Sequence, residues 1–257
     1  MGKAAVRNRI KAEIEETRVL LGSIPSSVVA LFVVSVIAMN ILANKELFSA
    51  PWIALDCGYA VSWVSFLLMD MICKRFGPKA SMTVSVLALT VNMAFFVVFH
   101  FLCLTPGHWG AYYDLLETDP ASAAVADSVL NATIGGSWYI VICSALAMLL
   151  SSAVNSLINH GIGRRLKTGG YKAFALRSFV STFIAQYVDN FAFSTMVSHL
   201  FFGWSWLQVA VCSLSGAVLE LLCEVIFSPI GYRRGVKWEE RNVGQTYIDH
   251  KNNQNCP

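Results

Sequence analysis

The stretch TFIAQYVDNFAF, residues Thr182–Phe193, decides how this chain folds. It lies inside a long apolar run, yet Gln186, Asp189 and Asn190 fall within about one helical turn of each other. A carboxylate at the centre of a bilayer costs roughly 3 kcal/mol on insertion scales, and such residues usually face a bundle interior or a water-filled cavity. We therefore expect this segment to form one wall of a solute-binding site inside a membrane bundle. The alternative is a buried polar contact that only holds helices together.

The composition indicates a protein that crosses a membrane several times. The chain has 257 residues, of which 56% are hydrophobic and 14% are charged, and its mean hydropathy is +0.56. Soluble domains are nearer to half apolar and a quarter charged. The first residues are polar and contain no apolar core segment, so no cleavable signal peptide is expected.

The apolar runs predict an all-α membrane protein with six transmembrane helices. These runs cover approximately residues 25–44, 51–73, 80–104, 137–161, 173–202 and 206–230. Together they make a transmembrane domain over residues 25–230. Residues 1–24 are expected as an amphipathic or flexible cytoplasmic tail, and residues 231–257 as a second cytoplasmic tail. An acidic loop at about residues 105–136 is expected on the external side.

The distribution of positive charge sets the expected orientation. Of the 19 Lys and Arg residues, all except Lys45 fall in the two tails or close to the connections that follow the second and fourth spans. The long acidic loop contains neither Lys nor Arg. Because cytoplasmic segments are enriched in these residues, the pattern predicts an even number of spans, with both termini in the cytoplasm.

Five acidic residues lie within the predicted spans. They are Asp56, Asp70, Asp189, Glu220 and Glu224. No Lys or Arg lies at comparable depth, so these acids cannot all be paired with a base inside the chain. Three explanations remain open: some keep a proton, some sit in water at span ends, and some receive a ligand that carries hydrogen-bond donors or positive charge. For Asp189 and Glu220 we favour the ligand.

Amides and aromatic rings at similar depth fit a planar heterocycle as the ligand. The amides are Asn40, Asn44, Asn155, Gln186 and Asn190, and the flat side chains are Trp63 and Tyr187. An aromatic face stacks on a ring, while a carboxylate accepts adjacent N–H and NH₂ donors such as those of a guanine-type edge. The alternative is that the amides join helices and that Trp63 packs in the core or faces lipid.

Enzymatic function is not expected. The sequence contains no H-E-x-x-H, G-x-S-x-G, P-loop or G-x-G-x-x-G motif. Its seven cysteines include no C-x-x-C pair. We therefore expect no metal site, no cofactor and no nucleic-acid partner. The expected partners are the lipid bilayer and a small planar solute.

Four stretches carry a resemblance to a known family. They are ANKELF (Ala43–Phe48), SWVSFLLMDMICKRFGPKAS (Ser62–Ser81), RSFVSTFIAQYVDNFAF (Arg177–Phe193) and LLCEVIFSPIGYR (Leu221–Arg233). They resemble the vitamin uptake transporter (VUT) family, whose best-understood members are queuosine precursor transporters. The resemblance implies an inner-membrane importer of queuine or a 7-deazaguanine for tRNA modification salvage. It also implies six helices similar to the substrate-binding components of energy-coupling factor transporters.

The resemblance adds substrate contacts to those that the residues themselves indicate. The family's Asn near the end of the first span falls on Asn44, its second-span Asp on Asp70, and its fifth-span Gln-x-x-Asp element on Gln186 and Asp189. The complete expected substrate site is Asn44, Trp63, Asp70, Asn155, Gln186, Asp189 and Glu220.

The sequence departs from the family pattern at a few positions. Ser152 and Asn155 stand where relatives often carry Gln and Asp, and Lys74 stands where many have an acid. These differences keep transport as the expected function but leave the exact substrate open. One alternative is the substrate-binding subunit of an energy-coupling factor vitamin transporter, with an ATP-driven energising module as its partner. An alternative of another class is a membrane scaffold or an integral-membrane enzyme.

Overall fold

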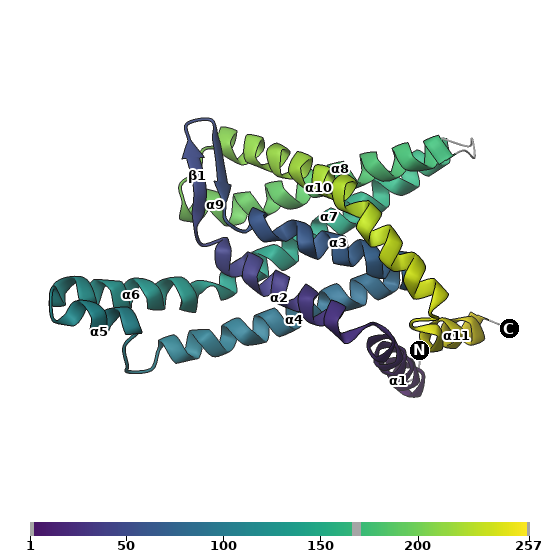
Figure 1. The fold of residues 1–257 in the computed structure, drawn as a ribbon, viewed down its shortest axis with the longest axis horizontal. Helices are drawn as coiled ribbons and strands as arrows, with labels where there is room; N and C mark the ends of the chain where they lie inside the picture. Colours follow the sequence, from purple (N-terminus) through teal and green to yellow (C-terminus); the bar gives the residue numbers. More distant parts are fainter. Residues whose placement is uncertain (1–2, 166–170, 256–257) are drawn as a thin grey trace. The chain divides into compact units, whose positions relative to one another are not determined.

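The computed structural model describes residues 3–165 and 171–255 and is 82% helical. Figure 1 shows the elements, which are in chain order α1 (Lys3–Ser23), α2 (Ser26–Leu42), β1 (Glu46–Ala50), β2 (Ile53–Asp56), α3 (Tyr59–Phe76), α4 (Pro78–Cys103), α5 (Gly110–Leu116), α6 (Pro120–Gly136), α7 (Trp138–Arg165), α8 (Tyr171–Met196), α9 (Ser198–Phe201), α10 (Trp206–Glu240) and α11 (Gln245–Asn255). The predicted helical character is therefore confirmed.

The chain divides into two compact units. Unit 1 comprises Met1–Val36, Trp63–Thr90 and Cys223–Pro257, and unit 2 comprises Ile37–Ser62 and Val91–Leu222. The boundaries fall inside α2, α3, α4 and α10, so each of these helices contributes residues to both units.

Unit 2 is built around α7 and α8, which pack along each other (Figure 1). A buried apolar cluster of Ala43, Ile140, Cys143 and Val197 joins this helix pair to the end of α2. The hydroxyl of Tyr139 donates to the carbonyl oxygen of Met196 at 3.0 Å, which ties the start of α7 to the end of α8.

The β1–β2 hairpin in unit 2 turns at Pro51 and Trp52 and is attached to the chain segment that begins α10. The indole nitrogen of Trp204 donates to the Glu46 carboxylate, and Gln208 Nε2 donates to the carbonyl oxygen of Ala50 at 2.8 Å. The hairpin and α10 share a buried cluster of Ala54, Tyr59, Trp204, Val209 and Cys212. These contacts fix the position of Asp56, the last residue of β2.

Local polar contacts hold α5 and α6 together as a helical hairpin. Asp119 caps α6, because its Oδ1 accepts the backbone N–H of Ser122 at 3.2 Å and a proline follows it at the first helical position. Asp127 accepts the backbone N–H of Trp109 at 2.7 Å, and the Trp109 indole donates to Asn131 Oδ1 at 2.7 Å.

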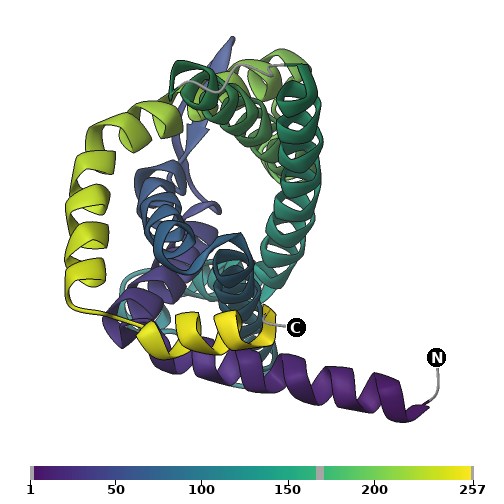
Figure 2. The same ribbon diagram turned by 90° about the vertical axis from the view of Figure 1, so that its right-hand side faces the viewer.

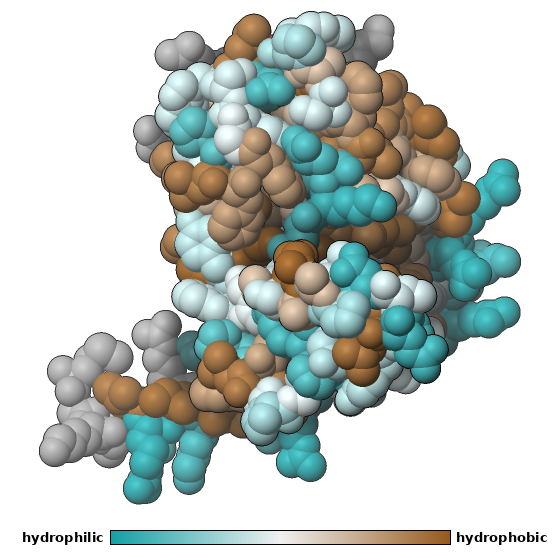
Figure 3. All heavy atoms as spheres, turned by 90° about the vertical axis from the view of Figure 1, so that its left-hand side faces the viewer, coloured by the Kyte–Doolittle hydropathy of each residue, from teal (hydrophilic) through white to brown (hydrophobic). Residues whose placement is uncertain are grey.

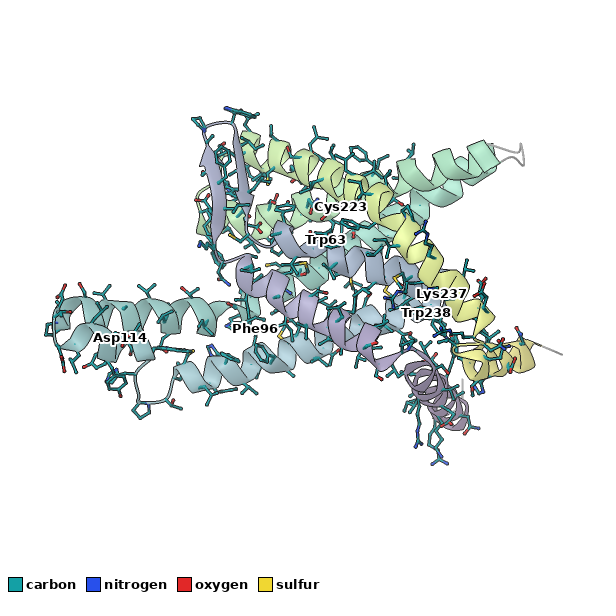
Figure 4. All side chains as sticks on the ribbon, in the orientation of Figure 1. Trp63, Phe96, Asp114, Cys223, Lys237 and Trp238 are labelled. Atoms are coloured by element: carbon teal, nitrogen blue, oxygen red, sulfur yellow. The ribbon has the colours of Figure 1, made fainter. Side chains whose placement is uncertain are left out.

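Unit 1 contains a tight turn between α3 and α4. Gly77 has φ +91°, a conformation that a glycine adopts without strain after a helix, and Pro78 then begins α4. The ring of Phe76 packs against Trp238 and Tyr247, with centroids 6.2 and 6.3 Å away (Figure 4 labels Trp238). Helix α11 lies alongside α1 at the bottom of Figure 2.

Among the described residues, three helical segments are long and apolar enough to cross a membrane. They are Pro78–Cys103, Pro120–Val154 and Trp206–Phe227, and the bent pair α1–α2 would make a fourth if it were one span. Large apolar side chains such as Val98, Leu146 and Leu222 are exposed on these helices. In Figure 3, brown hydrophobic side chains gather in several areas between teal hydrophilic ones. Exposed apolar area of this extent is expected where lipid covers the surface.

The structure differs from the sequence-based expectations at four places. The predicted second span begins with the β-hairpin, and its helix starts only at Tyr59. The loop expected at residues 105–136 is mostly helical, in α5 and α6. The helix of the predicted sixth span, α10, does not end near Pro229 but continues to Glu240. The C-terminal tail contains α11.

Candidate solute-binding site

Helix α8 presents a polar face inside unit 2. Gln186, Asp189 and Asn190 are spaced three and four residues apart, so they lie on one side of the helix. Gln186 and Asn190 are both 7% exposed. The hydroxyl of Ser151, from the packed helix α7, donates to Asp189 Oδ1 at 2.8 Å. Gln186 and Asn190 are therefore buried on this face, while Asp189 is partly exposed and is held by Ser151.

Helix α10 adds a second carboxylate to this face. Glu220 is 4% exposed, and its Oε2 accepts a hydrogen bond from Asn190 Nδ2 at 3.2 Å. The side chain of Ser62 also donates to Glu220, which in turn interacts electrostatically with Asp189. The predicted site residues Gln186, Asp189 and Glu220 are thus brought together by tertiary structure.

A third acid, Asp56, reaches the same region from the hairpin. It is 3% exposed and interacts electrostatically with Glu220. Its Oδ1 accepts the backbone N–H of Gly58 at 2.7 Å. Burial raises the pKa of Asp56 to about 7, although the hydrogen bonds from the backbone of Gly58 and Tyr59 oppose this rise.

Close packing around Gly216 holds α10 against this region. A Cβ on this residue would lie 2.5 Å from Tyr59 Cε1 and 2.9 Å from Asn190 Nδ2. Only glycine allows so close an approach between α10, the start of α3 and α8. The geometry of the Asn190–Glu220 hydrogen bond therefore depends on a glycine one turn before Glu220.

Several buried polar atoms of unit 2 have no hydrogen-bond partner among the described residues. They are Gln186 Oε1, both side-chain polar atoms of Asn40 and of Asn92, and the hydroxyls of Ser194, Thr195 and Ser198. Gln186 and Ser194 lie on the α8 face that carries Asn190, because they are four residues to either side of it. Buried polar groups nearly always have partners in native proteins, so water or a bound molecule has to supply the partners of these atoms.

The polar cluster of unit 2 is defined by Asp56, Ser62, Ser151, Gln186, Asp189, Asn190 and Glu220. It contains three carboxyl groups, and no ion pair to a Lys or Arg is found for them among the described residues. A ligand with several N–H donors, or with a positive charge, matches such an acceptor-rich site.

Other predicted site residues make different contacts. Asn44 Nδ2 donates to Ser137 Oγ at 2.9 Å and thereby ties the end of α2 to the start of α7. Trp63 belongs to unit 1, where its indole stacks on Phe227 with centroids 4.4 Å apart (Figure 4 labels Trp63). The side chains of Asp70 and Asn155 lie outside the described part of the structure. For these four residues, substrate contact stays a prediction.

The structure adds residues that the sequence-based site did not include. Ser151 donates a hydrogen bond to the carboxylate of Asp189 on α8, and Asn190 donates one to the carboxylate of Glu220 on α10. Asn190 stands beside Asp189 in the decisive stretch, so its position was a usable signal. Gly216 stands one turn before Glu220 and so lies on the same face of α10, but its close packing is visible only in the structure. Within the described residues, no group of His, Cys, Asp and Glu is arranged to hold a metal ion.

A comparison with protein families gives a match to residues 56–233 of this chain. The matching family is described as "Putative vitamin uptake transporter". The matched range is well over half of the 257 residues and contains Asp56, Asp189 and Glu220. The chain belongs to this family. As a vitamin uptake transporter family member with several apolar helices, it is a membrane protein of the transporter class.

The resemblance read from the sequence motifs is thereby confirmed at the level of the family. The family match favours a transporter over an enzyme. No curated protein and no solved structure significantly matches the chain. The polar cluster is therefore the main structural indication of which substrate this vitamin uptake transporter family member binds.

Proposed function

We propose that this protein imports a small planar solute across the inner membrane, and that the solute is a queuosine precursor: queuine or a 7-deazaguanine. The observation that supports it best is the polar cluster of unit 2, where Ser151 orients Asp189 and Asn190 orients Glu220. The motif resemblance to queuosine precursor transporters supplies the substrate class.

The chemistry of the cluster fits the edge of such a ring. A guanine-type edge presents adjacent N–H and NH₂ donors, and one carboxylate accepts both in a bidentate pair. In this proposal Asp189 accepts that edge, while Gln186 Oε1 accepts a further donor. Asn44, Asn155 and Glu220 would complete or line the site, while substrate contacts of Trp63 and Asp70, which belong to unit 1, stay sequence-based expectations.

The proposal includes six spans, formed by α2, α3, α4, α7, α8 and α10. The charge distribution supports it, because Lys45 stands alone among the 19 Lys and Arg residues on the side assigned to the exterior. Both termini are then cytoplasmic. Transport proceeds by alternating access to a site near the midplane, as in other transporters that bind their substrate between helices.

The test is the queuosine content of tRNA in a bacterial host that lacks queuosine synthesis and its own importer. The host expresses this chain and receives each precursor at low concentration. We expect wild type to restore queuosine, and Asp189→Ala to lower uptake about tenfold or more through the loss of charge-assisted hydrogen bonds. The matched control is Asp114→Ala, because Asp114 is an exposed acid on α5 (Figure 4).

Failure of every precursor in a correctly inserted wild type, both with and without an ATP-driven energising module, would contradict a queuosine precursor as the substrate. The same experiment with an ATP-driven energising module from the source organism distinguishes a self-sufficient carrier from a substrate-binding subunit. Restoration only with the module would assign the chain to the second class. Equal uptake by Asp189→Ala and wild type would exclude the polar cluster as the substrate site.

A further inference from the structure

Helix α1, in unit 1, carries an exposed apolar row. Val6, Ile10 and Ile14 are spaced four residues apart and therefore lie along one side of the helix. Their exposed fractions are 45%, 52% and 62%. In Figure 3, α1 projects at the lower left, with hydrophobic side chains and hydrophilic side chains next to each other along it.

A basic row runs beside the apolar one. Arg7, Lys11 and Arg18 are exposed, and their spacings of four and seven residues place them on one side of α1. Arg7 precedes Ile10 by three residues and Lys11 precedes Ile14 by three, so the two rows are neighbours on the helix surface. A row of apolar side chains with Lys and Arg along one side is found in helices that lie in the interface of anionic membranes, and the exposed Glu13 lies on the other side of the row.

The opposite side of α1 is held by the protein. Glu16 accepts hydrogen bonds from Lys79 Nζ at 2.5 Å and from the Tyr247 hydroxyl at 3.3 Å. Leu20, one turn further, is buried. Helix α11 lies alongside α1 (Figure 2). These contacts fix the rotation of α1, so the apolar and basic rows stay directed away from the rest of unit 1.

The bend between α1 and α2 gives the orientation. The two helices meet at 101° around Pro25, which cannot continue the hydrogen bonding of α1. In unit 1, α2 exposes Leu31 and Val34, as a helix surrounded by lipid does. With α2 as the first of the six proposed spans, α1 lies at about a right angle to it and therefore runs along the membrane plane, at the level of the lipid headgroups.

We propose that α1 is a membrane-surface helix that binds anionic phospholipid headgroups through Arg7, Lys11 and Arg18 while Val6, Ile10 and Ile14 enter the headgroup–acyl boundary. This goes beyond solute import and does not depend on the identity of the solute. Anionic lipid is the partner that matches both rows at once, because the basic row finds phosphates and the apolar row finds acyl chains.

The test measures amide hydrogen exchange of residues 6–18 in the full chain, reconstituted in nanodiscs. Discs of phosphatidylcholine alone are compared with discs that contain phosphatidylglycerol. Slower exchange of α1 in the anionic discs is expected, and 1 M salt should remove most of the difference because it shortens the Debye length to about 3 Å. Equal exchange in the two lipids would overturn the proposal. It would mean that the apolar and basic rows of α1 contact a protein partner or solvent.

Variants sharpen this test. Each basic residue near an anionic surface strengthens attachment roughly fivefold, so Arg7→Gln with Lys11→Gln and Arg18→Gln should reduce the lipid-dependent protection on the order of 100-fold. The matched control replaces three other arginines by Gln. These arginines are also exposed but lie outside α1: Arg233, Arg234 and Arg241. Ile10→Asn should also weaken attachment, in both lipids. If the control variant with three Arg→Gln changes lost as much protection, the effect would come from the net charge of the protein, and this would contradict the role of α1.

Discussion

Gly216→Ala should damage both the stability and the binding site, because one added carbon meets two side chains at once. The new Cβ would lie 2.5 Å from Tyr59 Cε1 and 2.9 Å from Asn190 Nδ2. Tyr59 cannot easily turn away, since it is buried with Ala54, Trp204 and Val209. Asn190 is the donor to Glu220, so its displacement disturbs the polar cluster.

The magnitude follows from two opposing terms. Overpacking a filled interior costs about 1–3 kcal/mol. Replacing a helical glycine by alanine in open space gains up to about 1 kcal/mol. Gly136→Ala serves as the control, because a Cβ on that helical glycine of unit 2 has nothing within 4 Å. The difference between the two alanine variants therefore isolates most of the overpacking cost.

The assay is thermal unfolding of the purified variants in the same detergent, followed by ligand titration. At about 2–4 °C per kcal/mol for a chain of this size, Gly216→Ala should melt about 2–12 °C below Gly136→Ala. Combining Gly216→Ala with Tyr59→Ala should cost less than the sum of the single changes, since the clash is removed. A Gly216→Ala protein as stable as Gly136→Ala, with unchanged binding, would refute the packing described around Glu220.

Three further changes test the same region. Ser151→Ala removes the 2.8 Å hydrogen bond to Asp189 and should weaken ligand binding about tenfold in calorimetry; unchanged affinity would mean that Ser151 does not orient the carboxylate. The pKa of Asp56 is about 7 in the folded protein and has its usual, lower value in the unfolded chain. The folded state therefore holds this proton more tightly, and the free energy of unfolding of wild type should fall as pH rises from 5 to 7.5. Asp56→Asn should reduce that loss, and an identical pH profile would argue against burial of this acid. Trp204→Phe removes the indole hydrogen bond to Glu46 and should lower the free energy of unfolding by about 1.5–3 kcal/mol. The control Trp206→Phe changes an exposed indole and should leave the free energy of unfolding unchanged.

Much of the helical framework was predictable from local pattern, and the exceptions have physical reasons. The segment ELFSAPWIALD reads as the entry to an apolar span, because short apolar runs do not distinguish a strand from a buried helix. Its hairpin depends on contacts of Glu46 and Ala50 with Trp204 and Gln208, which no local pattern reveals. In contrast, Asp119 followed by proline was a readable helix start for α6.

The candidate site was predictable only in part. Asp189 and Glu220 stand out in the sequence because an acid inside an apolar run needs a physical reason. Their partners come from other helices, as Ser151 and Asn190 show, so the polar cluster emerges only from tertiary packing. Trp63 illustrates the reverse case: the sequence favours a ligand for its aromatic face, with core packing or lipid as the alternative, and in unit 1 that face stacks on Phe227.

The most direct test of the central claim is calorimetric titration of the purified chain in nanodiscs with an aminomethyl-7-deazaguanine. The account predicts binding to wild type, equal binding to Asp114→Asn, and affinity at least about tenfold lower for Asp189→Asn, which keeps the size of the side chain but loses its charge. Binding by Asp189→Asn as tight as by wild type would contradict the claim that the polar cluster of unit 2 reads the solute.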